Sequence, residues 1–120
     1  MAVKRRKESD ILASTYFDSM DIIRSVDIEG DRNHLIDMQD KVIAREVPCE
    51  LDKESDALLN NSDVVGVVAS YTIFCRPNVD VREGDKLIVN HLDRIYDCVA
   101  GVPFNFSSHL EIPVSLEERV

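Results

Sequence analysis

The amino-acid sequence predicts a mainly β fold, a small antiparallel β-barrel or sandwich of about six strands with a short N-terminal helix. Residues 109–117 alternate between apolar and polar side chains, as is typical of a half-buried strand. Residues 64–76 are rich in Val, Tyr, Thr, Ile and Phe, which favour strands. Single glycines and prolines separate these runs, which indicates short strands joined by turns.

We expect residues 1–17 to form a mobile basic arm followed by the short helix. The arm contains a run of four basic residues, Lys4, Arg5, Arg6 and Lys7. From Ser9 to Phe17 the apolar residues lie at helical spacing, and Ser9 is placed to cap the first turn. A helix this short is stable only when it packs against the rest of a protein.

Two strands are predicted next, at 20–28 and 41–51. The apolar residues of the first strand share one face, and Arg24 is the single charged residue on that face. Pro48 indicates an edge position or a bulge in the second strand. Residues 29–40, between the two strands, contain Gly, Asp and Asn and predict a turn followed by a polar loop.

A second polar loop is predicted at 52–63, with two adjacent leucines at its middle. Such leucines indicate either a surface that a partner covers or a single helical turn that packs them into the domain's own core. The candidate partner-contact residues are therefore Leu58, Leu59, Asn60 and Asn61.

The second half of the chain is punctuated by turn residues. Gly84 predicts a turn with positive φ, and the residues around Leu92 predict a hairpin loop. Pro113 predicts that the last strand lies at an edge. The strands expected here are 64–76, 86–90, 94–100 and 109–117.

Length and composition predict a single domain over residues 18–120 with an aliphatic core. The net charge of −9 argues against general binding of nucleic acid through its phosphates. No run of about 18 apolar residues is present, so we expect no membrane association. Cys49, Cys75 and Cys98 are expected to be buried thiols, and a cytoplasmic site of synthesis is expected.

The sequence contains no complete catalytic or metal-binding pattern. A zinc site built from Cys75, Cys98 and His91 is conceivable, but none of these residues has metal-ligand spacing. A nucleophilic pair of Cys98 and His109 would need a base and a lowered thiol pKa, and nothing local supplies them. We therefore expect no enzyme activity and no cofactor.

The basic run is the one feature that suggests contact with a polyanion. Its four residues, Lys4, Arg5, Arg6 and Lys7, would give weak binding that is sensitive to salt. The alternative is a solubilising terminus. No aromatic residues lie among basic ones, so no platform for stacking bases is predicted.

An ordered set of motifs between Val47 and Glu117 resembles the head-completion (head-closure) proteins of tailed bacteriophages and prophages. It begins with the Pro-Cys pair at Pro48 and continues through Tyr71-Thr72-Ile73-Phe74. The stretch from Pro77 to Leu87 is similar to the family's "Pro-x-x-Asp-Ile-x-x-Gly-Asp" turn, and Ser108–Ile112 is similar to its closing strand.

The resemblance implies a β-barrel subunit of the virion neck that forms a ring, expected to be a dodecamer, below the portal and adaptor. Such a ring retains packaged DNA, which only passes through it, and offers a docking surface to tail proteins. By this analogy the loop at 52–63 would face a neighbour or the channel. Two alternatives stay open: another neck or tail component (an adaptor or tail terminator), or a small β-barrel module that binds peptides along the strand edge at 111–116. A small hydrolase is a more distant third.

Overall fold

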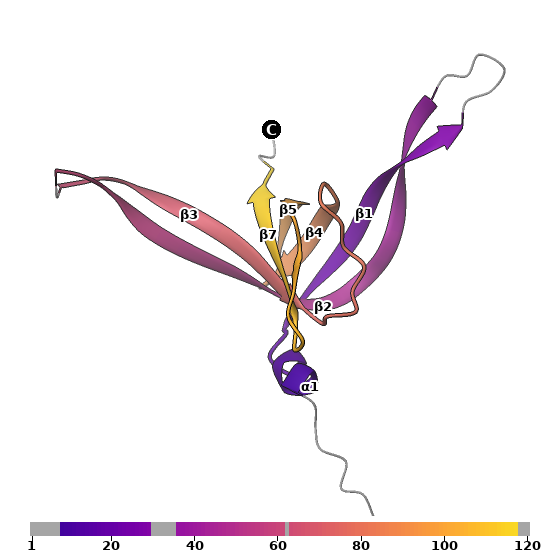
Figure 1. Ribbon diagram of the computed structural model, residues 1–120, viewed down its shortest axis with the longest axis horizontal. Helices are drawn as coiled ribbons and strands as arrows, with labels where there is room; N and C mark the ends of the chain where they lie inside the picture. The colour runs from indigo at the N-terminus through magenta and orange to yellow at the C-terminus, as the bar shows by residue number, and fades with distance from the viewer. Residues whose placement is uncertain (1–7, 30–35, 62, 118–120) are drawn as a thin grey trace, which may run out of the picture.

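The structure is a computed structural model that describes residues 8–29, 36–61 and 63–117. The described chain forms one short helix and one antiparallel sheet, which confirms the predicted fold class (Figure 1). The elements are α1 (Glu8–Ala13), β1 (Asp18–Glu29), β2 (Ile36–Asn60), β3 (Asp63–Cys75), β4 (Lys86–His91), β5 (Arg94–Ala100), β6 (Phe104–Asn105) and β7 (Leu110–Leu116).

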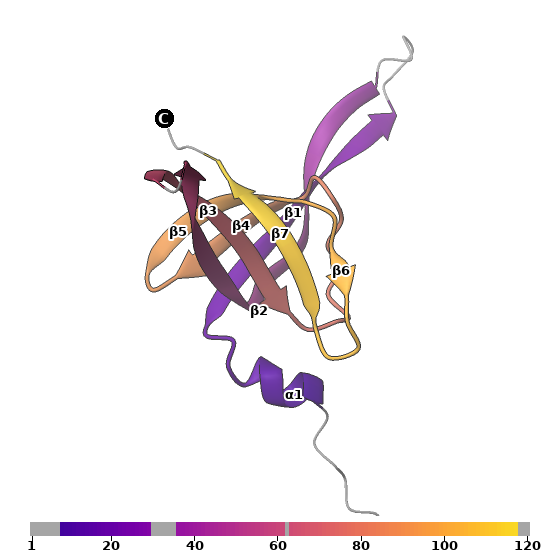
Figure 2. The ribbon, with the colours of Figure 1, turned by 60° about the vertical axis from the view of Figure 1, so that its left-hand side comes forward.

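The strands follow one another around an unevenly closed barrel. Their order is β3-β2-β1-β4-β5-β7-β6, and an additional pairing of β7 with β3 completes the ring. β7 pairs with β3 along Tyr71–Cys75 but with β5 only along Cys98–Ala100. β6 is an appendage on the outer end of β7, and α1 lies below the barrel (Figure 2).

β2 is the longest strand, with 25 residues, and it changes partner at its middle. Residues 36–49 pair with β1, whereas residues 49–60 pair with β3. Cys49 is the crossing point, because it is opposite Asp18 on one side and Cys75 on the other. β2 therefore contributes to two hairpins that diverge from the base of the barrel (Figure 1).

Both hairpins extend beyond the barrel as two-stranded arms. The β1–β2 arm comprises residues 24–29 and 36–41, beyond the last pair of β1 with β4 at Ile23. The β2–β3 arm comprises residues 54–61 and 63–70, beyond the last pair of β3 with β7 at Tyr71. The arms give the molecule extents of 63 × 58 × 27 Å.

The core lies inside the barrel and is aliphatic, as predicted. Its fully buried side chains come from six strands and include all three cysteines, which are free thiols. Leu110 and Ile112 point inward from β7, which confirms the predicted face of that strand. The buried apolar residues are Met20, Ile22, Cys49, Leu51, Ile73, Cys75, Val81, Leu87, Val89, Cys98, Ala100, Leu110 and Ile112.

The polar loop predicted at 52–63 is replaced by the β2–β3 arm. Residues 52–60 continue β2, and Asp63 begins β3. The predicted loop at 29–40 is likewise partly strand, because Glu29 ends β1 and residues 36–40 open β2. Polar composition was misleading in both places because a hairpin can hold polar residues in strands through cross-strand pairs alone.

β7 is not an edge strand, although Pro113 predicted that it would be. It pairs with β3 on one side and with β5 and β6 on the other. Pro113 lies between the β5 and β6 pairings, and its carbonyl oxygen accepts a hydrogen bond from Gly101 N at 2.7 Å. Its ring nitrogen faces the same gap, so the missing N–H removes no bond from the β3 ladder. A Cβ at Gly101 would lie 3.1 Å from Pro113, which accounts for the glycine.

Two turns have the conformations that the sequence indicated. Gly84 has a φ of 89°, and Leu92 and Asp93 have φ values of 49° and 62°. Positive φ at both central residues makes the β4–β5 turn type I′. The helix is shorter than the predicted Ser9–Phe17. Within the described residues, no helix is long and apolar enough to cross a membrane.

Candidate functional site

The tip of the β2–β3 arm carries the four residues predicted to contact a partner. Leu58 and Asn60 lie in β2, and the backbone register shifts between Leu58 and Leu59. Leu59 is 64% exposed, and Asn61 turns the chain with a φ of 51°. The arm therefore places an apolar side chain far from the barrel, where the isolated subunit offers it little to pack against.

Arg24 joins the base of the β1–β2 arm to the connection between β3 and β4. Its Nε and Nη2 atoms each donate to Asp85 at 2.9 Å, and Nη2 also donates to Asp80 at 3.2 Å. Asp85 is buried and accepts a further hydrogen bond from Arg82 N. Hydrogen bonding by Arg24 lowers the pKa of Asp80 below its ordinary value, and hydrogen bonding to Asp85 raises the pKa of Arg24.

Asp18 has a similar role where β2 crosses the barrel. Its two carboxylate oxygens lie 2.8 and 2.9 Å from Nδ1 of His91, and Oδ2 accepts a hydrogen bond from Leu51 N at 2.8 Å. This one buried side chain thus ties β1, β2 and β4 together at the point where the two arms diverge. Satisfied buried polar groups of this kind fix strand positions.

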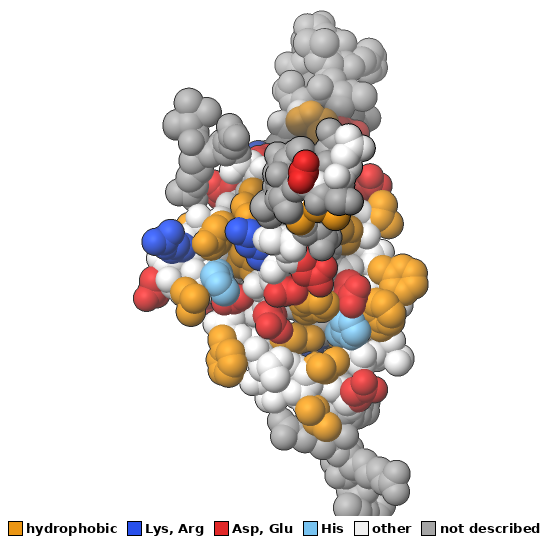
Figure 3. Space-filling view, turned by 90° about the vertical axis from the view of Figure 1, so that its left-hand side faces the viewer, with side chains coloured by type: hydrophobic (Ala, Val, Ile, Leu, Met, Phe, Trp, Pro, Cys, Tyr) orange, Lys and Arg blue, Asp and Glu red, His pale blue; other side chains and the backbone are white. Residues whose placement is uncertain are grey.

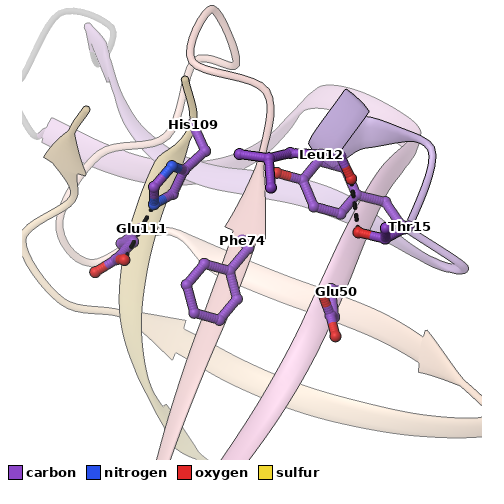
Figure 4. Close-up of a pocket in the computed structure, with 7 residues that line it drawn as sticks. Leu12, Thr15, Glu50, Phe74, His109 and Glu111 are labelled. Carbon is purple, nitrogen blue, oxygen red and sulfur yellow. Dashed lines mark hydrogen bonds and ion pairs between the residues drawn. The ribbon is translucent and has the colours of Figure 1, made fainter. Parts of the chain in front are cut away.

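A groove of about 340 Å³ lies between α1 and the outer face of the sheet (Figure 4). Asp10 of α1 holds the helix to the barrel through Arg76, at 2.8 Å. Nε2 of His109 lies 3.0 Å from Oε1 of Glu111, and Nδ1 lies 2.8 Å from Oγ of Ser108. The lining residues are Leu12, Thr15, Tyr16, Glu50, Phe74, His109 and Glu111.

The floor of this groove is part of a row of side chains that runs across four strands. Glu50 is opposite Phe74, Phe74 is opposite Glu111, and Glu111 is opposite Phe104. Directly opposite residues point to the same face of a sheet. Phe74 therefore has a carboxylate on each side, as Figure 4 shows.

Further aromatic side chains continue from the His109 end of the groove. The ring of Phe106 stacks on His109 with centroids 4.7 Å apart, and Phe104 lies 4.9 Å from Phe106. Phe104 is 62% exposed. Figure 3 shows acidic and apolar side chains intermixed on the face that bears the β2–β3 arm.

The cysteines do not have the properties of nucleophiles. Burial raises the pKa of Cys75 to about 12 and that of Cys98 to about 11, and it raises the pKa of Cys49 as well. Cys98 lies in the core, whereas His109 lines the outer groove, so the conceivable pair is not assembled. His91 contacts Asp18, and the described residues contain no group of His, Cys, Asp or Glu arranged to hold a metal ion.

Of the residues singled out in the sequence, Lys4, Arg5, Arg6 and Lys7 lie outside the described residues. The strand edge at 111–116, considered for peptide binding, is occupied, because β7 is paired on both sides. Sequence reasoning missed the Arg24 cluster. Its signal was present in the cation that interrupts an apolar strand face and in the two aspartates of the Pro77–Leu87 motif.

The fold defines this chain as a small antiparallel β-barrel with two projecting hairpins. It is shared with the solved structure of the phage-like element PBSX protein xkdH from Bacillus subtilis. The two structures align with a TM-score of 0.52 at 18% sequence identity, over 84% of this chain and 95% of the other. Comparisons with protein-family models and with curated proteins find no significant match.

Proposed function

We propose that this protein is a head-completion protein of a tailed phage or prophage neck. It forms a ring below the portal and adaptor, retains packaged DNA and provides a docking surface for the tail. The observation that carries the proposal is the fold shared over 84% of the chain with a protein of a phage-like element. The ordered motifs between Val47 and Glu117, which resemble those of head-completion proteins, also support the proposal.

The shape of the subunit supports a role in assembly. A two-stranded ribbon has little stability of its own in water, and both of its edges expose unpaired backbone groups. This chain has two such arms, with apolar side chains such as Met38 and Leu59 more than 60% exposed. Neighbouring subunits in a ring would cover these surfaces and stabilise the arms.

The charge of the subunit also suits a channel through which DNA passes. The chain has a net charge of −9, and an acidic surface repels phosphates instead of holding them. A ring of such subunits would let the genome slide past. Its retention of DNA would then be mechanical, through the arms, and not through ionic grip.

The direct test adds the purified protein to DNA-filled heads that carry portal and adaptor but lack completion proteins. We expect new density below the adaptor and reduced release of DNA. Leu59→Asp should weaken this activity, and Leu92→Asp is the matched control, since Leu92 is also exposed but lies on the β4–β5 turn. Absence of binding by the unaltered protein to these heads would contradict the proposal.

Order of addition separates the proposal from the adaptor and tail-terminator alternatives. A head-completion protein should bind heads only after the adaptor ring is present. An adaptor should bind the bare portal, and a tail terminator should bind purified tails in the absence of heads.

A further inference from the structure

The groove between α1 and the sheet combines apolar and acidic side chains. Leu12, Tyr16 and Phe74 make it apolar, while Glu50 and Glu111 place carboxylates on the two sides of Phe74. The side chain of Glu50, on strand β2, makes no hydrogen bond or ion pair with the described residues. The groove therefore suits a segment that has both positive charge and apolar length.

Lysine and arginine have this character, because long hydrocarbon stems carry their charged ends. A guanidinium or ammonium group over the face of Phe74 would gain cation–π attraction while its charge meets Glu50 or Glu111. The sequence holds one run of four such residues, Lys4, Arg5, Arg6 and Lys7. This run has no role in the proposed function described above.

We propose that the N-terminal segment, residues 1–7, docks in the groove of a second copy of this chain. In the sequence the segment directly precedes Glu8, the first residue of α1, and α1 contributes Leu12 to the groove. Seven extended residues span at most about 25 Å, which is enough to leave one subunit and enter an adjacent one.

Docking in the groove of the same chain would require a sharp reversal immediately before α1. Residues 1–7 contain no Gly, Pro, Asn, Asp or Ser, the residues that form such turns. Extension toward a neighbour needs no turn. The inference goes beyond the proposed function, because it applies to any assembly in which two copies of this chain meet.

A charge-swap experiment on full-length protein tests the docking. One variant reverses the segment (Lys4→Glu, Arg5→Glu, Arg6→Glu and Lys7→Glu), and the other reverses the groove (Glu50→Lys and Glu111→Lys). Each variant alone pairs like charges and should not self-associate. Their mixture restores opposite charges and should associate at least tenfold more tightly than either variant alone.

The readout is the set of groove amide resonances, at Leu12, Phe74 and His109, in isotope-labelled segment-reversed protein mixed with unlabelled groove-reversed protein. These resonances should shift on mixing, and the shifts should vanish as salt rises from about 0.01 M to about 1 M, because the Debye length falls from about 30 Å to about 3 Å. Replacing the groove-reversed protein with Glu83→Lys/Glu117→Lys protein is the control. That protein has the same net charge as the groove-reversed protein, but its own groove stays acidic. Because its segment is still basic, it should still shift the resonances of the labelled groove.

Unaltered protein gives a second measurement that does not depend on the folding of the groove variant. Its groove resonances should differ from those of the segment-reversed protein, and the difference should disappear on hundredfold dilution. A difference that persists unchanged on dilution would place the segment in its own groove and overturn docking between copies. No shift in either experiment would overturn docking altogether.

Discussion

At the scale of single residues, two buried carboxylates hold the barrel to its arms. Asp85 receives a bidentate contact from Arg24, and Asp18 contacts both His91 and the backbone of Leu51. Asp85 lies beside Arg24, where the β1–β2 arm leaves the barrel, and Asp18 is opposite Cys49, where β2 changes partner. Since a buried charge is stable only when it is paired, these contacts fix the strands that begin the arms.

Arg24→Ala should lower the free energy of unfolding by about 3 kcal/mol, because it leaves Asp85 buried with only its backbone donor. Chemical denaturation at neutral pH measures this. Arg82→Ala is the control, since its ion pair with Asp80 is exposed and long, at 3.9 Å, and should change stability by less than about 0.5 kcal/mol. Adding Asp85→Asn to Arg24→Ala should recover part of the loss, and equal losses in the two arginine variants would contradict the argument.

The three buried thiols predict a stability that falls at high pH. Burial raises the pKa of Cys98 to about 11 and that of Cys75 to about 12, from the ordinary value of 9.0. The folded state therefore favours the protonated thiols. Their contribution to the free energy of unfolding is complete below pH 9 and decreases above it. Urea unfolding between pH 7 and about pH 11 measures this. Above pH 9 the free energy of unfolding should fall more steeply for the unaltered protein than for a triple Cys→Ala variant. Parallel curves would contradict this assignment.

At the scale of elements, the β4–β5 hairpin shows what local sequence does not decide. A type I′ turn favours Asn-Gly, yet here Leu92 and Asp93 occupy both positions of positive φ. Leu92 is 81% exposed, so no burial compensates its backbone strain. The hairpin forms because every residue of Lys86–His91 is paired with one of residues 94–99.

Replacing Leu92-Asp93 with Asn-Gly should therefore raise the free energy of unfolding by about 1 kcal/mol, through relief of left-handed backbone strain. Leu92→Ala is the matched control, because alanine removes the exposed side chain but keeps the strain. Thermal and urea unfolding of the two variants check this. A stabilisation of similar size in both would show that the exposed leucine, and not the turn, is the unfavourable feature.

The sequence predicted the barrel strands better than the arms for a physical reason. In β7 the alternation of apolar residues records which face is buried, and the structure confirms that face at Leu110 and Ile112. In the arms, neither face of the hairpin is buried in the barrel, so the sequence need not alternate between apolar and polar residues. Residues 52–60 therefore resembled a loop. The groove could not be predicted from the sequence either, because Glu50, Phe74 and Glu111 come together only through the register of three strands.

At the scale of the whole molecule, the arms dominate the dimensions. The radius of gyration is 18.2 Å, whereas a compact domain of this length would have about 14 Å. The isolated subunit therefore has far more surface than its barrel requires. The proposed ring assembly would cover part of this excess surface.

Small-angle scattering of the monomer should accordingly give a radius of gyration near 18 Å and not near 14 Å. A variant in which Asn-Gly replaces residues 55–69, joining the paired residues Glu54 and Ser70, should be measurably smaller. Its melting temperature should stay within a few degrees of the unaltered protein's, since the removed residues pair only with each other. A large loss of stability would instead make the arm part of the barrel's folding unit.

The shared strand β2 also limits how this molecule can change in length during evolution. An insertion of one residue near Cys49 would turn over every side chain of β2 on one side of the insertion, exchanging core for surface. Insertions or deletions at the two tips, when made as matched pairs across a hairpin, would leave the barrel register intact. The length of each arm can therefore change independently of the other, while the strand crossing at Cys49 stays the same.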